Sequence, residues 1–266
     1  MARLGVKSSS AQRNLRLLIS YDGTDYHGWQ TQPSLPTVQA CIEQTVAQIT
    51  GNRVKLFGSG RTDAGVHALG QVANFTTACP IPCGNLLKAL NDLLPPAVRV
   101  RRVEEVRADF HARYAVRSKT YRYRILQAGI CSPFLWRFVW HHPRALDRRR
   151  MSEAAAALVG EHDFTSFAAA GSAEDDVAPG GEPRSMVRTL SASRILWRER
   201  TKILAYEVRG SGFLHHMVRN LVGTLVEVGR GRMAPGDVAR ILEAQNRTLA
   251  GPTAPAQGLC LVRVEY

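Results

Sequence analysis

The order of predicted strands and helices is similar in the two halves of the chain, and this repeat restricts the fold more than any other sequence feature. Hydrophobic periodicity in the first half predicts strand, helix, two strands, helix and strand, at residues 15–21, 38–50, 54–58, 71–77, 85–95 and 98–106. The second half predicts a strand, a helix, a strand pair, two helices and a strand, at residues 120–127, 148–160, 189–199, 202–210, 215–230, 236–245 and 259–266. Two such split β-α-β units predict an α+β fold, with antiparallel sheets, helices on one side and a central cleft at their junction.

The repeat also predicts how the chain divides. We expect a disordered basic tail at residues 1–13, an N-terminal lobe at 14–107 and a C-terminal lobe at 108–266. The segment 171–185 is rich in Gly, Pro and acids, which is typical of a mobile surface loop. No apolar run approaches the ~18 residues of a membrane span, and the N-terminal residues lack the apolar core of a signal peptide, so we expect a cytoplasmic protein.

The charge of the chain indicates a polyanionic partner. Among 266 residues, 35 are Lys or Arg and 22 are Asp or Glu, a formal net charge of +13. Such a field attracts phosphates, and arginine suits bidentate phosphate contacts. A solvated basic surface without a partner is the alternative interpretation.

The densest basic patch lies at residues 110–125. It interleaves basic and aromatic side chains, namely Arg113, Arg117, Lys119, Arg122 and Arg124 with Tyr114, Tyr121 and Tyr123. From Tyr121 the alternation has period two, so the tyrosines share one strand face and Arg122 and Arg124 the other. The patch can hold a nucleic-acid backbone and stack bases, or it can form an edge strand whose tyrosines pack on a core.

Cysteines and histidines do not predict a metal site. Of five scattered cysteines only Cys79 and Cys83 lie close together, and no second pair or nearby histidine completes a zinc site. His215 and His216 are adjacent, and neighbouring positions do not share a helix face, so we interpret them as poor joint ligands. We therefore expect no metal.

A single carboxylate, Asp63, lies in the glycine-rich turn of "GSGRTDAGVHALGQVANF", residues 58–75, two residues after Arg61. No other Asp or Glu occurs between Glu43 and Asp92. A phosphate-binding loop is disfavoured because no Gly-Lys-Ser/Thr follows, and a glycosidase site is disfavoured because no second carboxylate is near. By itself, Asp63 can also be an ordinary turn residue.

Together with other segments, this turn resembles bacterial tRNA pseudouridine synthases of the TruA family. The segments that match family motifs, in family order, are "YDGTDYHGWQ", "TVQ", "GRTDAGVHALGQVANF", "DFHARYAVRSKTYRY", "GEHDFTSF", "FLHHMVRNLVGTLVEVG" and "GLCLVRVEY". The resemblance implies a homodimer of two-lobed, ferredoxin-like subunits that isomerises uridines in the anticodon arm of tRNA, at positions 38, 39 and 40, without a cofactor. A catalytically idle RNA-binding protein of the same fold is the alternative.

The resemblance also implies roles for individual residues. Asp63 matches the nucleophile and Arg219 its basic partner, while Tyr121 matches a tyrosine that packs against the base and Leu259 an apolar residue that covers the uracil. Arg61 is a local alternative as the basic partner, or orients the turn or binds phosphate. The sequence leaves open whether Asp63 adds to the sugar, adds to the base or promotes a glycal-type elimination.

Further residues are expected to contact the RNA. From the basic patch we expect Arg113, Arg117 and Lys119 to neutralise phosphates. His215 and His216 resemble a pair at the start of a helix, and we expect them to contact RNA or to cap the turn.

Overall fold

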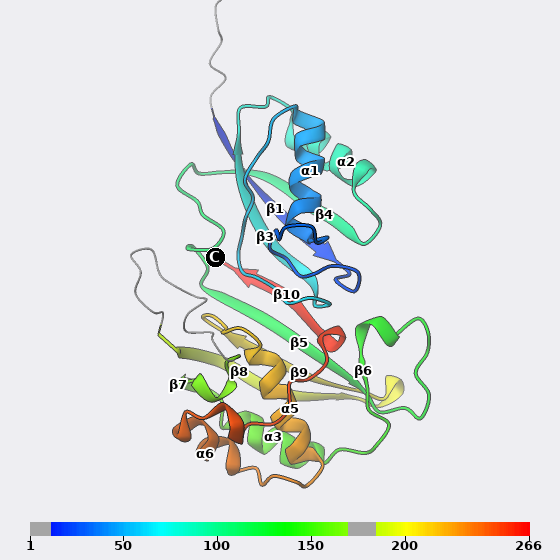
Figure 1. The fold of residues 1–266 in the computed structure, drawn as a ribbon, viewed down its shortest axis with the longest axis vertical. Helices are drawn as coiled ribbons and strands as arrows, with labels where there is room; N and C mark the ends of the chain where they lie inside the picture. Colours follow the sequence, from blue (N-terminus) through cyan, green and yellow to red (C-terminus); the bar gives the residue numbers. More distant parts are fainter. Residues whose placement is uncertain (1–11, 170–184) are drawn as a thin grey trace, which may run out of the picture.

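The structure of this protein is a computed structural model, which describes residues 12–169 and 185–266 (Figure 1). The first half of the chain forms β1 (Arg13–Tyr21), α1 (Val38–Thr50), β2 (Phe57–Gly58), β3 (His67–Thr77), α2 (Cys83–Leu93) and β4 (Val98–Val106). The second half forms β5 (Ser118–Leu126), β6 (Trp140–His141), α3 (Arg148–Ala156), β7 (Gly160–Asp163), β8 (Val187–Arg198), β9 (Ile203–Gly210), α5 (Met217–Gly229), α6 (Asp237–Ala244) and β10 (Leu259–Glu265). The predicted elements occur in the predicted order and the α+β class is confirmed, but the short strands β6 and β7 were not predicted.

Two segments predicted from composition lie largely outside the described residues. The predicted tail at 1–13 is described only at its end, where Arg13 begins β1 and its guanidinium binds Glu105 at 2.8 Å. The loop predicted at 171–185 lies outside the described residues except for Ser185. Within the part of the chain that the structure describes, no helix is both long and apolar enough to cross a membrane.

One sheet runs through both halves of the chain. Its strands follow the order β4-β1-β3-β10-β5-β9-β8-β7, with β2 beside β3 and β6 beside β5. Most pairs are antiparallel, as predicted, but β10 lies parallel to β3 and pairs Cys260 with His67. The same strand lies antiparallel to β5. The C-terminal strand therefore joins the sheets of the two halves, a pairing that local sequence patterns do not reveal.

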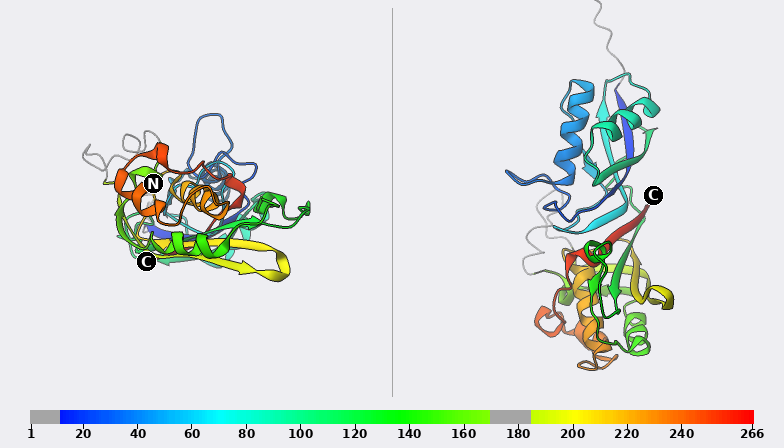
Figure 2. Two further views of the ribbon diagram at one scale, coloured as in Figure 1. Left: turned by 90° about the horizontal axis from the view of Figure 1, so that it is seen from below. Right: turned by 90° about the vertical axis from the view of Figure 1, so that its right-hand side faces the viewer.

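The two faces of the sheet differ in character. A row of directly opposed residues crosses β3, β10, β5 and β9 and is buried throughout: Ala68, Leu261, Tyr121 and Val208. Helices α1 and α5 lie over this face (Figures 1 and 2). The next row, on the opposite face, contains Arg122 and Glu207, which form an ion pair at 2.6 Å. The prediction that the tyrosines and arginines of β5 occupy opposite faces is confirmed.

The structure decides the role of Tyr123. Its side chain is fully buried in the core, and its hydroxyl donates a hydrogen bond to the carbonyl of Pro255 at 2.7 Å. Tyr123 therefore packs in the core and is not available to stack on a base.

Candidate active site

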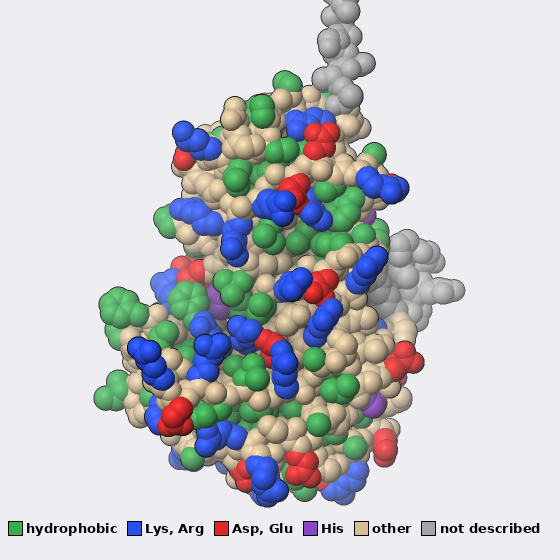
Figure 3. Space-filling model, turned by 180° about the vertical axis from the view of Figure 1, so that it is seen from behind, with side chains coloured by type: hydrophobic (Ala, Val, Ile, Leu, Met, Phe, Trp, Pro, Cys, Tyr) green, Lys and Arg blue, Asp and Glu red, His purple; other side chains and the backbone are tan. Residues whose placement is uncertain are grey.

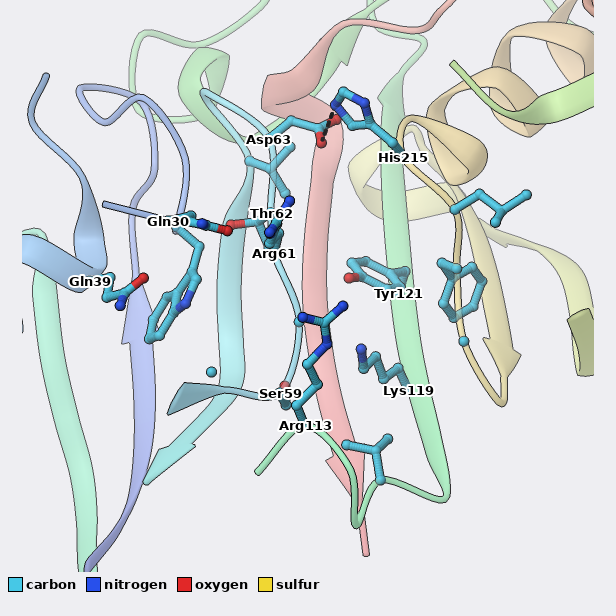
Figure 4. Close-up of a pocket in the computed structure, with 18 of the residues that line it drawn as sticks. Gln30, Gln39, Ser59, Arg61, Thr62, Asp63, Arg113, Lys119, Tyr121 and His215 are labelled. Atoms are coloured by element: carbon cyan, nitrogen blue, oxygen red, sulfur yellow. Dashed lines mark ion pairs between the residues drawn. The ribbon is translucent and has the colours of Figure 1, made fainter. Parts of the chain in front are cut away.

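A cleft of about 1060 Å³ lies between the two halves of the molecule (Figure 4). Segments that are distant in sequence line it, among them the turn that contains Asp63, the start of β5 with the loop before it, and the segment that leads into α5. Of the ten residues predicted to form the site, nine line this cleft: Asp63, Tyr121, Arg219, Arg61, Leu259, Arg113, Lys119, His215 and His216. Arg117 lies instead in a second groove.

Backbone hydrogen bonds from a neighbouring loop hold the turn that carries Asp63. The Trp29 amide donates to the carbonyl of Thr62 at 3.0 Å, and the Gly65 amide donates to the carbonyl of Tyr26. Gly28, at φ +86°, permits this close approach, since a Cβ there would lie 2.5 Å from the Thr62 oxygen. Backbone hydrogen bonds therefore fix the position of the turn that carries Asp63 in the cleft.

Arg219 of α5 is the direct partner of Asp63. Its Nη1 lies 3.0 Å from Asp63 Oδ2, and its Nε donates to the carbonyl of Ala254 at 2.8 Å. Both side chains are mostly buried, at 16% and 19% exposed. Because one nitrogen is fixed by a backbone carbonyl, the guanidinium is oriented toward the carboxylate. Arg61, the local alternative, is exposed and forms no ion pair with Asp63 in the described structure, so the geometry favours Arg219.

His215 and His216 also face Asp63, which the sequence argument did not predict. His215 Nε2 lies 3.6 Å from Asp63 Oδ1, and His216 Nε2 lies 3.5 Å from Asp63 Oδ2. The interpretation that adjacent residues point apart is wrong here because it assumes a helix. His216 has φ +60° and precedes the first turn of α5, so helical spacing does not apply.

Asp63, His215 and His216 are the one group of side chains in the described part of the chain that could hold a metal ion. Their ligand atoms all lie within 4.8 Å of one another. A metal ion bound to Asp63 would lie close to the Arg219 guanidinium, and the two positive charges would repel each other. Burial lowers the pKa of His216, although the charge of Asp63 acts in the opposite direction. A neutral His216 leaves Asp63 with Arg219 as its principal cation.

Tyr121 and Leu259 form an apolar part of the cleft wall. The ring of Tyr121 meets Phe213 edge to face, with 5.0 Å between ring centroids. Burial, with smaller contributions from Tyr21 and Asp63, raises the pKa of Tyr121 far above its usual value. Its hydroxyl is therefore protonated at neutral pH and can donate a hydrogen bond. Leu259 is 5% exposed.

The predicted basic residues lie along the cleft. Lys119 places its Nζ against Gly60, where a Cβ would be only 2.5 Å away. In Figure 4, Arg113 and Lys119 lie together on one side of Tyr121, whereas Asp63 lies on the other side. A chain of phosphates could therefore follow the cleft away from Asp63.

Comparison with known proteins identifies the family. A family model described as "tRNA pseudouridine synthase" matches residues 17–115 and 154–266. The chain belongs to this family. A "tRNA pseudouridine synthase A" of Solibacter usitatus is 51% identical over 96% of this chain and 100% of its own length, and one of Acetivibrio thermocellus is 43% identical over the same shares. A chain of a solved Cbf5-Nop10-Gar1 complex aligns with 92% of this chain and 57% of its own, but with 12% identity and a TM-score of 0.32 it carries no argument.

In this tRNA pseudouridine synthase family member, sequence reasoning missed three aromatic side chains of the cleft. Phe57, His111 and Phe213 all line it. Phe213 precedes the histidine pair, and His111 lies two residues before Arg113, so proximity to predicted residues was the only available signal. An aromatic side chain is as common in a hydrophobic core as in a binding site, so the residue type alone does not identify these three.

Proposed function

We propose that this protein converts uridine to pseudouridine in the anticodon arm of tRNA, at positions 38, 39 and 40. The observation that carries the proposal is the Asp63–Arg219 pair, a single carboxylate with an oriented guanidinium partner inside a basic cleft. Relatives that match this chain over their full length and are named tRNA pseudouridine synthase A support the same reaction.

The reaction needs only groups that the cleft supplies. The bond between C1′ of the ribose and N1 of uracil breaks, the base turns, and C1′ bonds to C5. The C5 proton is lost and N1 takes up a proton, so the product is an isomer and no redox cofactor is consumed. Asp63 is the group that assists departure of the base, by addition or by promoting elimination.

Arg219 and Tyr121 support this role of Asp63. The Arg219 guanidinium binds the Asp63 carboxylate at 3.0 Å and orients it for attack. The Tyr121 ring and Leu259 enclose the uracil while it turns, and the neutral Tyr121 hydroxyl can hydrogen-bond to the base as the C5 proton leaves. A closed apolar wall also keeps water from capturing the sugar.

A tRNA transcript tests the reaction and its positions together. After incubation with the protein, the RNA is digested and its nucleosides are separated by chromatography. We expect pseudouridine to form, and to be lost in steps when the uridines at positions 38, 39 and 40 are replaced by cytidine. Pseudouridine that persists after all three replacements would contradict the positions, and RNA binding without pseudouridine would favour the idle alternative.

We also propose a cytoplasmic homodimer, on the basis of the family resemblance and the tRNA substrate. Light scattering coupled to size exclusion is expected to give twice the chain mass of 29.3 kDa. A mass of one chain at micromolar concentration would contradict the dimer.

A further inference from the structure

A row of aromatic rings follows one wall of the cleft. The ring centroids of Phe57 and His111 are 4.8 Å apart, and those of His111 and Tyr114 are 4.3 Å apart. The Lys55 ammonium lies 5.4 Å from the centroid of the Phe57 ring. All four residues line the same cleft as Asp63. The row therefore belongs to the surface that RNA would contact.

Tyr114 ends this row and is far more exposed than a core tyrosine. It keeps 64% of its surface exposed, whereas Tyr121 keeps 7% and Tyr123 none. Removing so exposed a ring from the fold would cost little buried area, so core packing does not explain it. The ring is held in place by His111 while much of its surface stays open to a partner.

The ring beneath Tyr114 is uncharged. His111 Nδ1 accepts a hydrogen bond from the Arg113 amide at 3.1 Å, which leaves that nitrogen without a proton. Burial, and then the charge of Arg113, lower the pKa of His111. A neutral imidazole beneath Tyr114 adds no positive charge to the site, and the open face of the ring can stack on a flat aromatic partner such as a nucleobase.

We propose that Tyr114 is a stacking platform for an unpaired nucleobase of the RNA, separate from the uridine that Asp63 receives. This inference rests on the proposed function for the identity of the RNA. Arg113, adjacent in sequence, lies on the other side of Tyr121 from Asp63 (Figure 4). A phosphate near Arg113 would bring a neighbouring base to Tyr114, and bases stack on aromatic rings independently of their sequence. The platform would hold the loop open while another nucleotide enters the cleft.

Fluorescence of 2-aminopurine tests the stacking directly. We use anticodon stem-loop RNAs with one loop base at a time replaced by 2-aminopurine, whose emission falls when it stacks on a ring. With the wild type and with Tyr114→Phe, we expect strong quenching at one loop position. With Tyr114→Ala, we expect this quenching to disappear and Kd to rise about 5- to 150-fold, the effect of losing one stacked base.

The control is Phe134→Ala, which removes an 88% exposed aromatic ring outside the cleft. It should keep both the quenching and the affinity. Because Tyr114 is uncharged, Tyr114→Ala should also keep the slope of log affinity against log salt. Quenching that survives Tyr114→Ala, or that is lost equally in Tyr114→Phe, would overturn the stacking role.

The stacking site and the proposed function fail in different ways. Quenching requires only binding, so a wild-type protein that quenches 2-aminopurine but forms no pseudouridine would refute the function and support the platform. A wild-type protein that forms pseudouridine but quenches no loop position would refute the platform and leave the function intact.

Discussion

Basic side chains gather both in the cleft and on the sheet face opposite α1 and α5, but the number of acids beside them differs between the two regions. On the sheet face opposite α1 and α5 (Figure 3), three glutamates each bind two arginines. The groups are Glu104 with Arg16 and Arg102, Glu207 with Arg122 and Arg194, and Glu265 with Arg209 and Arg263. These groups stabilise the sheet, and in each of them one carboxylate neutralises half of the positive charge.

The cleft has a much larger excess of cations over acids. Among the described residues that line it, Asp63 is the only acid. Six basic residues share the lining: Lys55, Arg61, Arg113, Lys119, Arg188 and Arg219. The comparison teaches that a net charge of +13 does not identify an RNA surface, whereas the local ratio of cations to acids does. The following predictions test this difference, beginning with the largest expected effect.

Arg219→Ala should have the greatest effect among the cleft cations. It removes the guanidinium that lies 3.0 Å from Asp63, so the rate at saturating tRNA should fall roughly 10²- to 10³-fold. Release of tritium from tRNA labelled at uracil C5 measures this rate. Arg194→Ala on the opposite face is the matched control and should retain the rate. Equal losses in both variants would show that the two faces do not differ.

Tyr121→Phe tests a neutral part of the cleft. It removes one hydroxyl and keeps the ring, so the rate at saturating tRNA should fall roughly 10- to 100-fold while Kd and the salt slope persist. Rapid-quench tritium release and a binding titration separate the two quantities. Weaker binding with full turnover would assign Tyr121 to RNA binding alone.

Arg113→Ala and Lys119→Ala test the charge ratio itself. If each cation neutralises one phosphate, each variant should lower the slope of log affinity against log salt by roughly 0.7 to 0.9. Arg122→Ala, which breaks a glutamate group on the other face, should leave the slope unchanged. If Arg122→Ala lowered the salt slope as much as Arg113→Ala and Lys119→Ala do, the RNA would contact the opposite face of the sheet, which contradicts this prediction.

Glu207→Gln should have a small effect, confined to stability. Although burial opposes it, hydrogen bonds from Arg194 and Arg122 lower the pKa of Glu207. The ionised carboxylate therefore stabilises the fold above its unfolded-state pKa, and this stabilisation is lost as pH falls through the lowered native pKa. Urea unfolding at pH 7 should show a loss of about 1 kcal/mol that vanishes in acid. A loss that persists in strong acid would not come from these ion pairs.

Local signals made much of the fold predictable from sequence. The predicted helix at 38–50 coincides with α1 because Thr37 caps its N-terminus, accepting from the Ala40 amide, and Gly51 ends it in a left-handed conformation. The pairing of β10 with β3 was not predictable, because it joins His67 to Cys260 and depends on tertiary contacts. It also explains why β3 begins at His67 and not at the predicted residue 71.

The site was predictable where a motif carried it. Asp63 stood out as a lone acid in a glycine-rich turn, and the matching motifs led to Arg219 and Tyr121, which the fold brings to the same cleft. The convergence of His215 and His216 was missed because a positive φ at a non-glycine residue cannot be read from sequence. The row of Phe57, His111 and Tyr114 was missed because it joins two segments only in three dimensions.

The central claim is that Asp63 performs the chemistry while the surrounding cations hold the RNA. The most direct measurement is tritium release and tRNA affinity of Asp63→Asn, with Asp109→Asn, an exposed acid outside the cleft, as the matched control. We predict that Asp63→Asn releases no tritium yet binds tRNA within about tenfold of the wild type, because phosphate contacts dominate affinity and an amide cannot act as the nucleophile. Tritium release by Asp63→Asn at a rate near that of Asp109→Asn would contradict the account.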